Sequence, residues 1–110
     1  MRNHEILPQY TVLENEHKIF SKRELEIIIL IASGFENSQI SEIFHVTLST
    51  IKKQLEKIYE KLRARNRAHA VFLAMFHNLI SENDFNTIMN SQEVKKFMEN
   101  NKSHFEKYNY

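Results

Sequence analysis

The stretch that decides the fold lies near the middle of the chain and reads NSQISEIFHVTLSTIKKQLEKIYEKL (Asn37–Leu62). It contains two helical patterns separated by about three residues. Asn37 is expected to cap the first, short helix, because an Asn side chain accepts a hydrogen bond from the first helical turn. Thr47 is expected to cap the second helix in the same way, with Thr50 in its first turn. The apolar residues of the first helix are Ile40, Ile43 and Phe44.

The second helix of this stretch has two chemically different faces. Its apolar residues recur at helical spacing and form a stripe that must be buried. They are Ile51, Leu55, Ile58, Tyr59 and Leu62. The opposite face carries small polar and charged residues, namely Ser49, Lys52, Lys53, Glu56 and Lys57. The hydroxyls and amide protons of the first turn lie at the leading end of this face.

Two consecutive short helices with these properties predict a helix-turn-helix. In that motif the first helix braces against the DNA backbone, while the second enters the major groove, which is about 12 Å wide. The segment Thr47–Arg67 contains seven basic and two acidic residues. Lys and Arg supply the phosphate contacts that dominate affinity. An alternative is a solvated surface on which Lys and Glu pair at i and i+4.

The rest of the composition agrees with one small helical domain. The 110 residues include one Gly and one Pro, so turn formers are scarce. They include no Cys, so disulfides and thiolate chemistry are absent. Residues 20–76 carry nine basic and six acidic side chains, whereas each flank has a net charge of −1. The positive middle segment favours an anionic partner.

A further helix is expected before this stretch. Ser21 and Glu24 have the spacing of a capping box, so the helix should begin near Lys22. Its residues are apolar nearly all round, which is typical of a central helix. Gly34, the single glycine, lies where a helix needs a left-handed residue to end.

Over about residues 20–76 the chain resembles the LuxR-type (GerE-like) DNA-binding domain. The matching residues are Phe20–Ile28 (FSKRELEII), Ile31–Gly34 (IASG), Asn37, Ile40, Val46, Thr47, Thr50–Lys52 (TIK), Ile58, Tyr59, Lys61, Leu62, Arg65–Ala68 (RNRA), Ala70 and Val71. The resemblance implies four helices, of which the third reads DNA and the fourth forms a two-fold dimer. It further implies a regulator of transcription acting at inverted repeats. A bacterial-type cytoplasmic protein is the default expectation for a sequence without a signal peptide or membrane span.

Carried over by position, the resemblance implies DNA-binding roles for particular residues. Thr50 and Lys52 would contact the groove edge and phosphate, with Lys53 and Glu56 facing bases. The other implied DNA-binding residues are Thr47 and Ser49 at the leading end, Lys57, Arg65 and Arg67 nearer the backbone, and Asn37 capping the brace helix beside a phosphate. The implied dimer interface consists of Ala68, Val71, Phe72 and Met75.

Four positions depart from the family pattern, namely Glu36, Gln54, Glu56 and Arg63. Glu56 matters most, because a carboxylate close to phosphates weakens binding unless it accepts a hydrogen bond from a cytosine amino group. Two interpretations stay open at this position. Either the preferred site has cytosine there, or DNA binding has weakened.

The flanks extend beyond the resemblance. Residues 1–19 are interpreted as an N-terminal arm, too short for a sensor domain, in which Tyr10–Leu13 either packs on the domain in extended form or belongs to a disordered tail. Residues 20–80 form the predicted DNA-binding domain, whose fourth helix spans about 68–80. Residues 81–110 form a helical C-terminal extension.

The extension is expected to contain two short helices. Ser81 or Asn83 caps the first, and Ser91 caps the second. The residues expected to be buried are Phe85, Ile88 and Met89 in the first, and Val94, Phe97 and Met98 in the second, followed by Phe105. Their apolar stripes pack on the core, on a second subunit or on a different protein.

Other classes of protein find little support. There is no glycine-rich phosphate loop, nucleophile elbow or Cys/His pair, so no enzyme is predicted. The six His residues have no metal-ligand spacing, no cofactor is implied, and no signal peptide or membrane span is expected. The prediction is an all-α, stand-alone, four-helix LuxR-type helix-turn-helix protein with a helical C-terminal extension, binding double-stranded DNA as a homodimer. The alternative is a module that has lost DNA binding and acts on another regulator by protein–protein contact.

Overall fold

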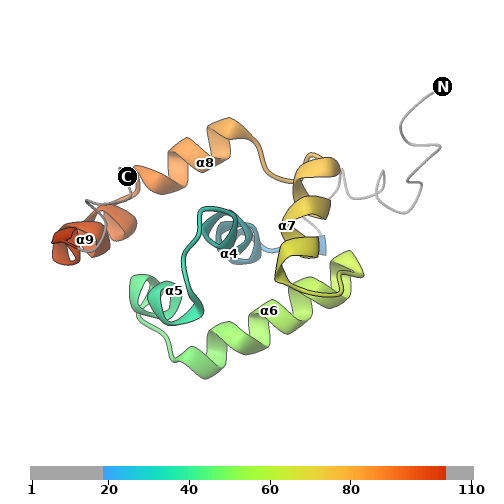
Figure 1. Ribbon diagram of the computed structural model, residues 1–110, viewed down its shortest axis with the longest axis horizontal. Coiled ribbons are helices and arrows are strands. Elements are labelled where there is room, and N and C mark those ends of the chain that lie inside the picture. The colour runs from blue at the N-terminus through green and yellow to red at the C-terminus, as the bar shows by residue number, and fades with distance from the viewer. Residues whose placement is uncertain (1–18, 104–110) are drawn as a thin grey trace.

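Helices make up the regular structure of the described part of the chain. The computed structural model describes residues 19–103, which form six helices and no strand. These are α4 (Lys22–Ala32), α5 (Asn37–Phe44), α6 (Leu48–Leu62), α7 (Arg67–Phe76), α8 (Glu82–Met89) and α9 (Gln92–Asn100), as Figure 1 shows. The predicted all-α class is therefore confirmed. The predictions for Tyr10–Leu13 and Phe105 lie outside the described residues.

Helix α4 is the centre of the structure. In Figure 1 it lies in the middle, and the other five helices are arranged around it. Ile27, Ile28 and Leu30 are completely buried, and α4 packs against α5, α6, α7 and α8. The nearly continuous apolar sequence of α4 is thus explained, because this helix meets protein on almost every side.

The predicted capping box at the start of α4 is confirmed. The Glu24 backbone N–H donates to Ser21 Oγ at 3.0 Å, and the Ser21 N–H donates to Glu24 Oε1 at 2.8 Å. Lys61 Nζ, from the end of α6, also donates to Glu24 Oε1 at 2.8 Å. Because the Glu24 carboxylate is buried, these donors offset the cost of its desolvation, and the ion pair ties α6 to α4. The chain leaves α4 through Gly34 at φ 94°, as predicted.

The connection between α5 and α6 is short, and one of its residues has a left-handed backbone conformation. His45 has φ 58°, and the Val46 N–H donates to the Ser41 carbonyl at 3.0 Å. Thr47 caps α6 as predicted, since its Oγ1 accepts from the Thr50 N–H at 3.1 Å. This arrangement places α5 and α6 as the two helices of a helix-turn-helix.

The predicted cap of α5 is wrong. The N-cap residue is Glu36, whose backbone is extended, and Asn37 is the first helical residue. The Glu36 N–H donates to the Gln39 side chain at 2.8 Å. The Asn37 side chain instead accepts a hydrogen bond from Arg67, at the start of α7, so a tertiary contact replaced the local one.

Helix α7 is shorter than the predicted 68–80. It ends at Phe76 because Asn78 takes a left-handed conformation with φ 60°, which Asn tolerates better than most residues. The Leu79 N–H then donates back to the Ala74 carbonyl at 2.8 Å, which buries Leu79.

The C-terminal extension packs on the helices of the core. Ser81, rather than the alternative Asn83, caps α8, and Ser91 caps α9 as predicted. These helices contact α4 and α5 respectively. Val94 and Phe97 are buried in the common core, where Phe97 meets Phe35 edge-on with ring centroids 6.0 Å apart. The predicted burial of Phe85 is wrong, because its side chain is 40% exposed; Ile88, Met89 and Met98 are half-buried. None of the helices in residues 19–103 combines the length and the apolar character that a membrane span requires.

Stability is expected to depend on the protonation of His77, the residue that follows α7. Desolvation by burial lowers the pKa of His77 below its ordinary value of about 6.5. As pH falls through about 6.5, the unfolded chain takes up this proton before the folded chain does, so the free energy of unfolding decreases. The free energy of unfolding, measured with urea, should therefore decrease more between pH 7 and pH 5 in the wild type than in His77→Gln. Equal losses in both proteins would contradict this prediction.

Candidate nucleic-acid interface

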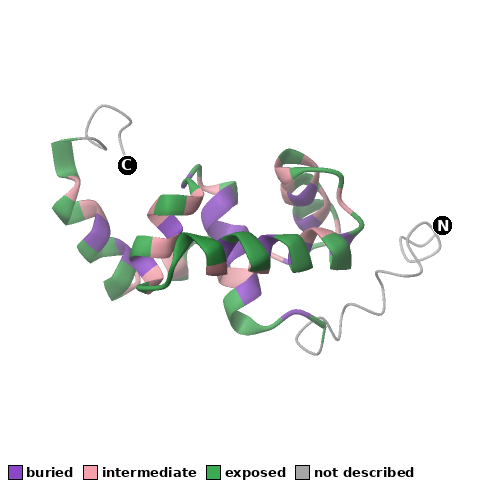
Figure 2. Cartoon of the chain, turned by 90° about the horizontal axis from the view of Figure 1, so that it is seen from below, coloured by how far each residue is buried: buried purple, intermediate pink, exposed green. Residues whose placement is uncertain are grey.

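The outer face of α6 is an exposed polar surface of the helix-turn-helix. Figure 2, in which α6 runs across the front, shows this helix as a mostly exposed band. The five residues predicted for this face are all exposed, namely Ser49, Lys52, Lys53, Glu56 and Lys57. The stripe behind it is buried at Ile51, Leu55, Ile58 and Leu62 and half-buried at Tyr59. The predicted division of α6 into two faces is confirmed.

The leading end of α6 offers hydrogen-bond donors. Thr47 Oγ1 and Thr50 Oγ1 lie 2.9 Å apart, and the first turn contains no acidic residue. The backbone N–H groups at this end therefore form a site that favours an anion. Val46 and Leu48, on either side of the cap, are exposed apolar residues. Sequence reasoning missed these two as surface residues, although neither belongs to the buried stripe.

The lysines on this face are not occupied by salt bridges. Among residues 19–103, Lys52, Lys53 and Lys57 form no ion pair, although Glu56 and Glu60 lie on the same helix. The alternative of a self-paired surface therefore has no support from the side-chain positions. Free ammonium groups are available to bind phosphates.

Acidic groups still share this face with the lysines. A shallow hollow on α6 is lined by Thr50, Lys53, Gln54, Glu56, Lys57 and Glu60. Two of these side chains are basic and two are acidic. The surface that would meet a nucleic acid is therefore mixed in charge, with Glu56 next to Lys57.

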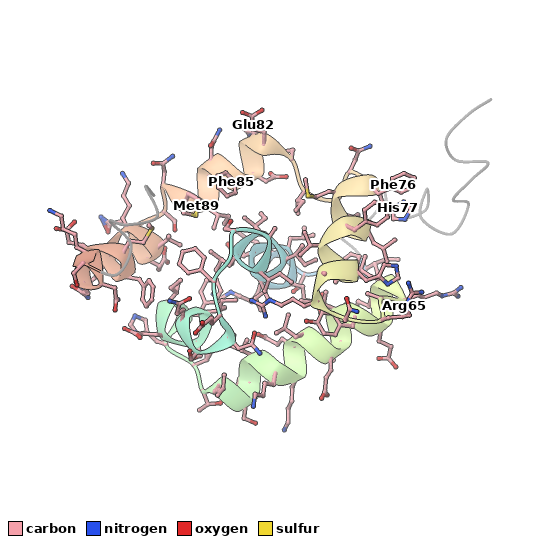
Figure 3. All side chains as sticks on the ribbon, viewed as in Figure 1. Arg65, Phe76, His77, Glu82, Phe85 and Met89 are labelled. Atoms are coloured by element: carbon pink, nitrogen blue, oxygen red, sulfur yellow. The ribbon has the colours of Figure 1, made fainter. Side chains whose placement is uncertain are left out.

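Two of the predicted phosphate contacts lie in different surroundings. Arg65 is exposed in the connection between α6 and α7, and Figure 3 shows its side chain pointing away from the body of the protein. Arg67 is only half-exposed. Its Nη1 donates to Asn37 Oδ1 at 2.6 Å, and its Nη2 donates to the Phe35 carbonyl. The predicted DNA-binding residues Asn37 and Arg67 are thus bonded to each other.

Helix α7 presents an exposed apolar surface. Phe72, Met75 and Phe76 are 57%, 59% and 51% exposed. The Phe72 and Phe76 rings are stacked with centroids 5.4 Å apart, and Figure 3 shows Phe76 beside His77 at the end of α7. Of the other residues predicted for the dimer interface, Ala68 is exposed and Val71 is half-buried. Sequence reasoning left Phe76 out of this set.

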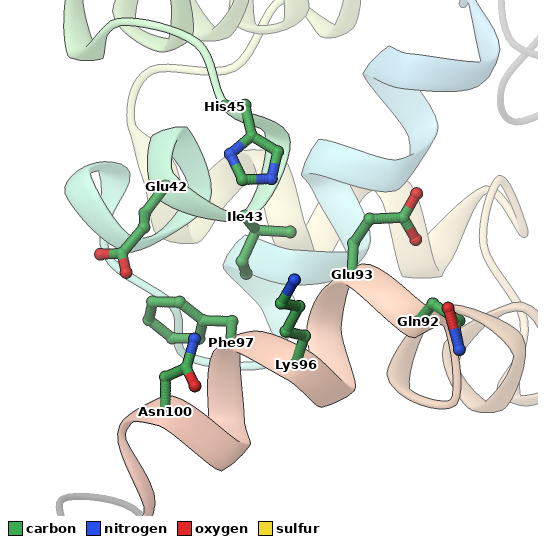
Figure 4. A pocket seen from close by; sticks show the side chains of 8 residues that line it. All are labelled: Glu42, Ile43, His45, Gln92, Glu93, Lys96, Phe97 and Asn100. Atoms are coloured by element: carbon green, nitrogen blue, oxygen red, sulfur yellow. The ribbon is translucent and has the colours of Figure 1, made fainter.

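A second hollow lies between α5 and α9. Figure 4 shows its lining, which consists of Glu42, Ile43, His45, Gln92, Glu93, Lys96, Phe97 and Asn100. Its volume is about 290 Å³, and its charged groups are of both signs. In the part of the chain that the structure describes, no three His, Asp or Glu side chains are grouped as metal ligands would be.

Comparisons with known proteins point to one family. Residues 18–74 match the family described as bacterial regulatory proteins, luxR family. The response regulator protein VraR of Staphylococcus aureus is 39% identical over 64 residues, which cover 58% of this chain and 31% of that protein. The VraR proteins of Staphylococcus saprophyticus and Staphylococcus epidermidis match to the same extent. The chain thus spans about a third of the length of these relatives. No solved structure matches it significantly.

Proposed function

Because the chain belongs to the luxR family of bacterial regulatory proteins, we propose that it regulates transcription by binding duplex DNA as a homodimer. The observation that carries this proposal is the outer face of α6. It joins unpaired lysines to a hydroxyl-rich helix N-terminus and is backed by a buried apolar stripe. A helix held in this way fits the major groove with its N-terminal half.

The proposed contacts follow the position of each side chain on α6. Thr50 and Lys52 lie at the groove edge, where they bind phosphate and base edges. Lys53 and Glu56 face the bases, while Lys57 and Arg65 lie nearer the backbone. Thr47 and Ser49 donate from the leading end. Asn37 and Arg67 support the motif from inside, because their side chains are bonded to each other.

Sequence selection tests this proposal directly. The purified protein is mixed with a random-sequence duplex pool, and the bound fraction is sequenced. We expect an enriched inverted repeat whose half-sites lie about one helical turn apart, roughly 10 base pairs from centre to centre. A bound fraction with the same sequence composition as the starting pool would contradict the proposal.

The proposed dimer forms through α7. Three large apolar side chains that are more than half exposed on one helix form a surface that solvent disfavours. In a two-fold dimer the same surface of the second copy would cover Ala68, Val71, Phe72, Met75 and Phe76.

The double variant Phe72→Glu/Met75→Glu should be monomeric. Four carboxylates would meet at the two-fold interface, while the core of each monomer is unchanged because both residues are exposed. Sedimentation velocity should show a dimer for the wild type and a monomer for the variant, with at least about tenfold weaker binding to the inverted repeat. The control is Phe85→Glu, which alters an exposed aromatic residue on α8. An unchanged dimer in the double variant would contradict the assignment of α7.

The second candidate function is a module that has lost DNA binding and acts through another regulator. The acidic groups in the hollow on α6 favour it, since Glu56 and Glu60 repel phosphate.

Glu56→Lys separates the two functions. If the wild type binds DNA and Glu56 accepts from a cytosine amino group, the variant should lose discrimination at that base pair by about 1–3 kcal/mol and bind all duplexes more evenly. The measurement is competition between duplexes that differ at one position. Affinity that appears only in the variant, with none in the wild type, would replace the first proposal with the second.

A further inference from the structure

Arg67 joins three parts of the chain. Its backbone begins α7, and its guanidinium donates through Nη1 to Asn37 Oδ1, at the start of α5, at 2.6 Å. Its Nη2 donates to the carbonyl of Phe35, in the connection between α4 and α5. We define Arg67, Asn37 and the Phe35 carbonyl as the Arg67 brace. Phe35 is itself buried and packs on Phe97 of α9, so the brace is anchored in the core.

The brace closes a triangle of helices. Helix α5 packs on α6, and α6 packs on α7. The hydrogen bonds of Arg67 add a polar link from α7 back to α5. In the bond to Asn37, the two residues are 30 positions apart in sequence. Because of this link, rotation of the helix-turn-helix relative to α7 requires breaking the two hydrogen bonds of Arg67. Hydrogen bonds from a charged donor are stronger than those between neutral groups.

We propose that Arg67 is a positioning residue that sets the half-site spacing accepted by the dimer. This inference rests on the proposed function, in which α7 forms the two-fold interface and α6 enters the groove. The distance between the two α6 helices then depends on how rigidly each one is held relative to α7. One added base pair moves a half-site by about 3.4 Å and rotates it by about 35°, so a rigid dimer discriminates strongly between spacings.

Arginine suits this role because of its shape. Its planar guanidinium presents N–H groups in a fixed fork, so it holds two acceptors at once in a defined geometry. Lysine keeps the positive charge but offers one flexible ammonium group. Arg67→Lys therefore removes the bracing geometry and leaves the charge available to a phosphate.

The test compares spacing profiles. The selected inverted repeat is prepared with its spacer changed by about −2 to +2 base pairs around the preferred length, and fluorescence anisotropy measures the affinity for each duplex. We expect the wild type to lose at least about tenfold in affinity when the spacer changes by two base pairs. In Arg67→Lys the same change of spacer should reduce the affinity by less than about threefold, and the salt dependence of binding should be unchanged.

Two further variants complete the design. Arg65→Ala, in the connection just before α7, is the matched control; it should weaken binding equally at all spacings and reduce the salt slope by about 0.9 for each phosphate that Arg65 neutralises. Asn37→Ala removes one acceptor of the brace and should flatten the spacing profile partly. It also serves as the test variant if circular dichroism shows that Arg67→Lys does not fold.

The possible results distinguish a failure of the Arg67 brace from a failure of the proposed function. A wild type that binds no duplex overturns the proposed function. A wild type with a spacing preference that Arg67→Lys and Asn37→Ala both retain overturns the brace. Equal weakening of binding by Arg67→Lys at every spacing also overturns it, because Arg67 would then have no effect on the half-site spacing that the dimer accepts.

Discussion

Replacing Lys52 and Lys53 together with alanine is expected to weaken binding to the selected duplex by about a hundredfold or more. A dimer loses four cations from its two α6 helices, and each good base-edge contact contributes about 1–3 kcal/mol. The slope of log affinity against log salt concentration should fall by about 0.9 for each phosphate that the variant leaves without a cation. Both side chains are exposed, so circular dichroism and the unfolding temperature should be unchanged.

The chain provides a matched control for this double variant. Lys95 and Lys96 are also adjacent, exposed lysines on a helix, but they belong to α9. Replacing them with alanine removes the same net charge away from α6 and should change affinity by less than about threefold. If the variant at positions 52 and 53 binds like the wild type, α6 does not present the recognition face.

Phe97→Ala is expected to lower the free energy of unfolding by about 3–5 kcal/mol. Phe97 is buried in the common core against Phe35, so its removal leaves a cavity between α9 and the helix-turn-helix. A domain of this size is stable by about 5–15 kcal/mol in total, and the loss is therefore a large fraction of it. Urea unfolding followed by circular dichroism measures the change.

Phe85→Ala is the comparison for Phe97→Ala, since it removes the same side chain from a position that is 40% exposed. The expected loss there is less than about 1 kcal/mol. A similar small loss at Phe97 would show that the extension contributes little to the stability of the core.

Local signals in the sequence predicted most of the fold. The caps at Ser21, Thr47 and Ser91 are confirmed, as is the two-faced pattern of α6, and Ser81 is the cap among the two candidates for α8. Both kinds of signal relate residues three or four positions apart, which the helix itself brings together. Such signals do not depend on how the helices pack, so they can be recognised in a single sequence.

Tertiary contacts explain the failures. Asn37 is a favourable cap residue by itself, but its side chain bonds Arg67, which is 30 residues away in sequence. The Lys61–Glu24 ion pair joins residues 37 positions apart, and nothing local in the sequence indicates it. Phe85 lies on an apolar stripe of α8, yet the stripe does not specify how much of it α4 covers.

The candidate site was predictable to a similar degree. Periodicity indicated that Lys52, Lys53 and Lys57 share an exposed face, and the structure confirms that arrangement. Their contacts with DNA stay a prediction, as does the dimer. The role of Arg67 required the structure, because a basic residue next to a helix N-terminus has the same sequence signal whether it binds phosphate or braces the fold.

The most direct test of DNA binding by α6 is fluorescence anisotropy of a labelled duplex pool, titrated with the purified protein at several salt concentrations. We predict saturable binding that weakens steeply with salt, with a slope of about −9 on the logarithmic scale if the dimer makes about ten phosphate contacts. The Lys52→Ala/Lys53→Ala variant should give a shallower slope in the same assay. Absence of binding by the wild type even at the lowest salt concentration would contradict DNA recognition by α6.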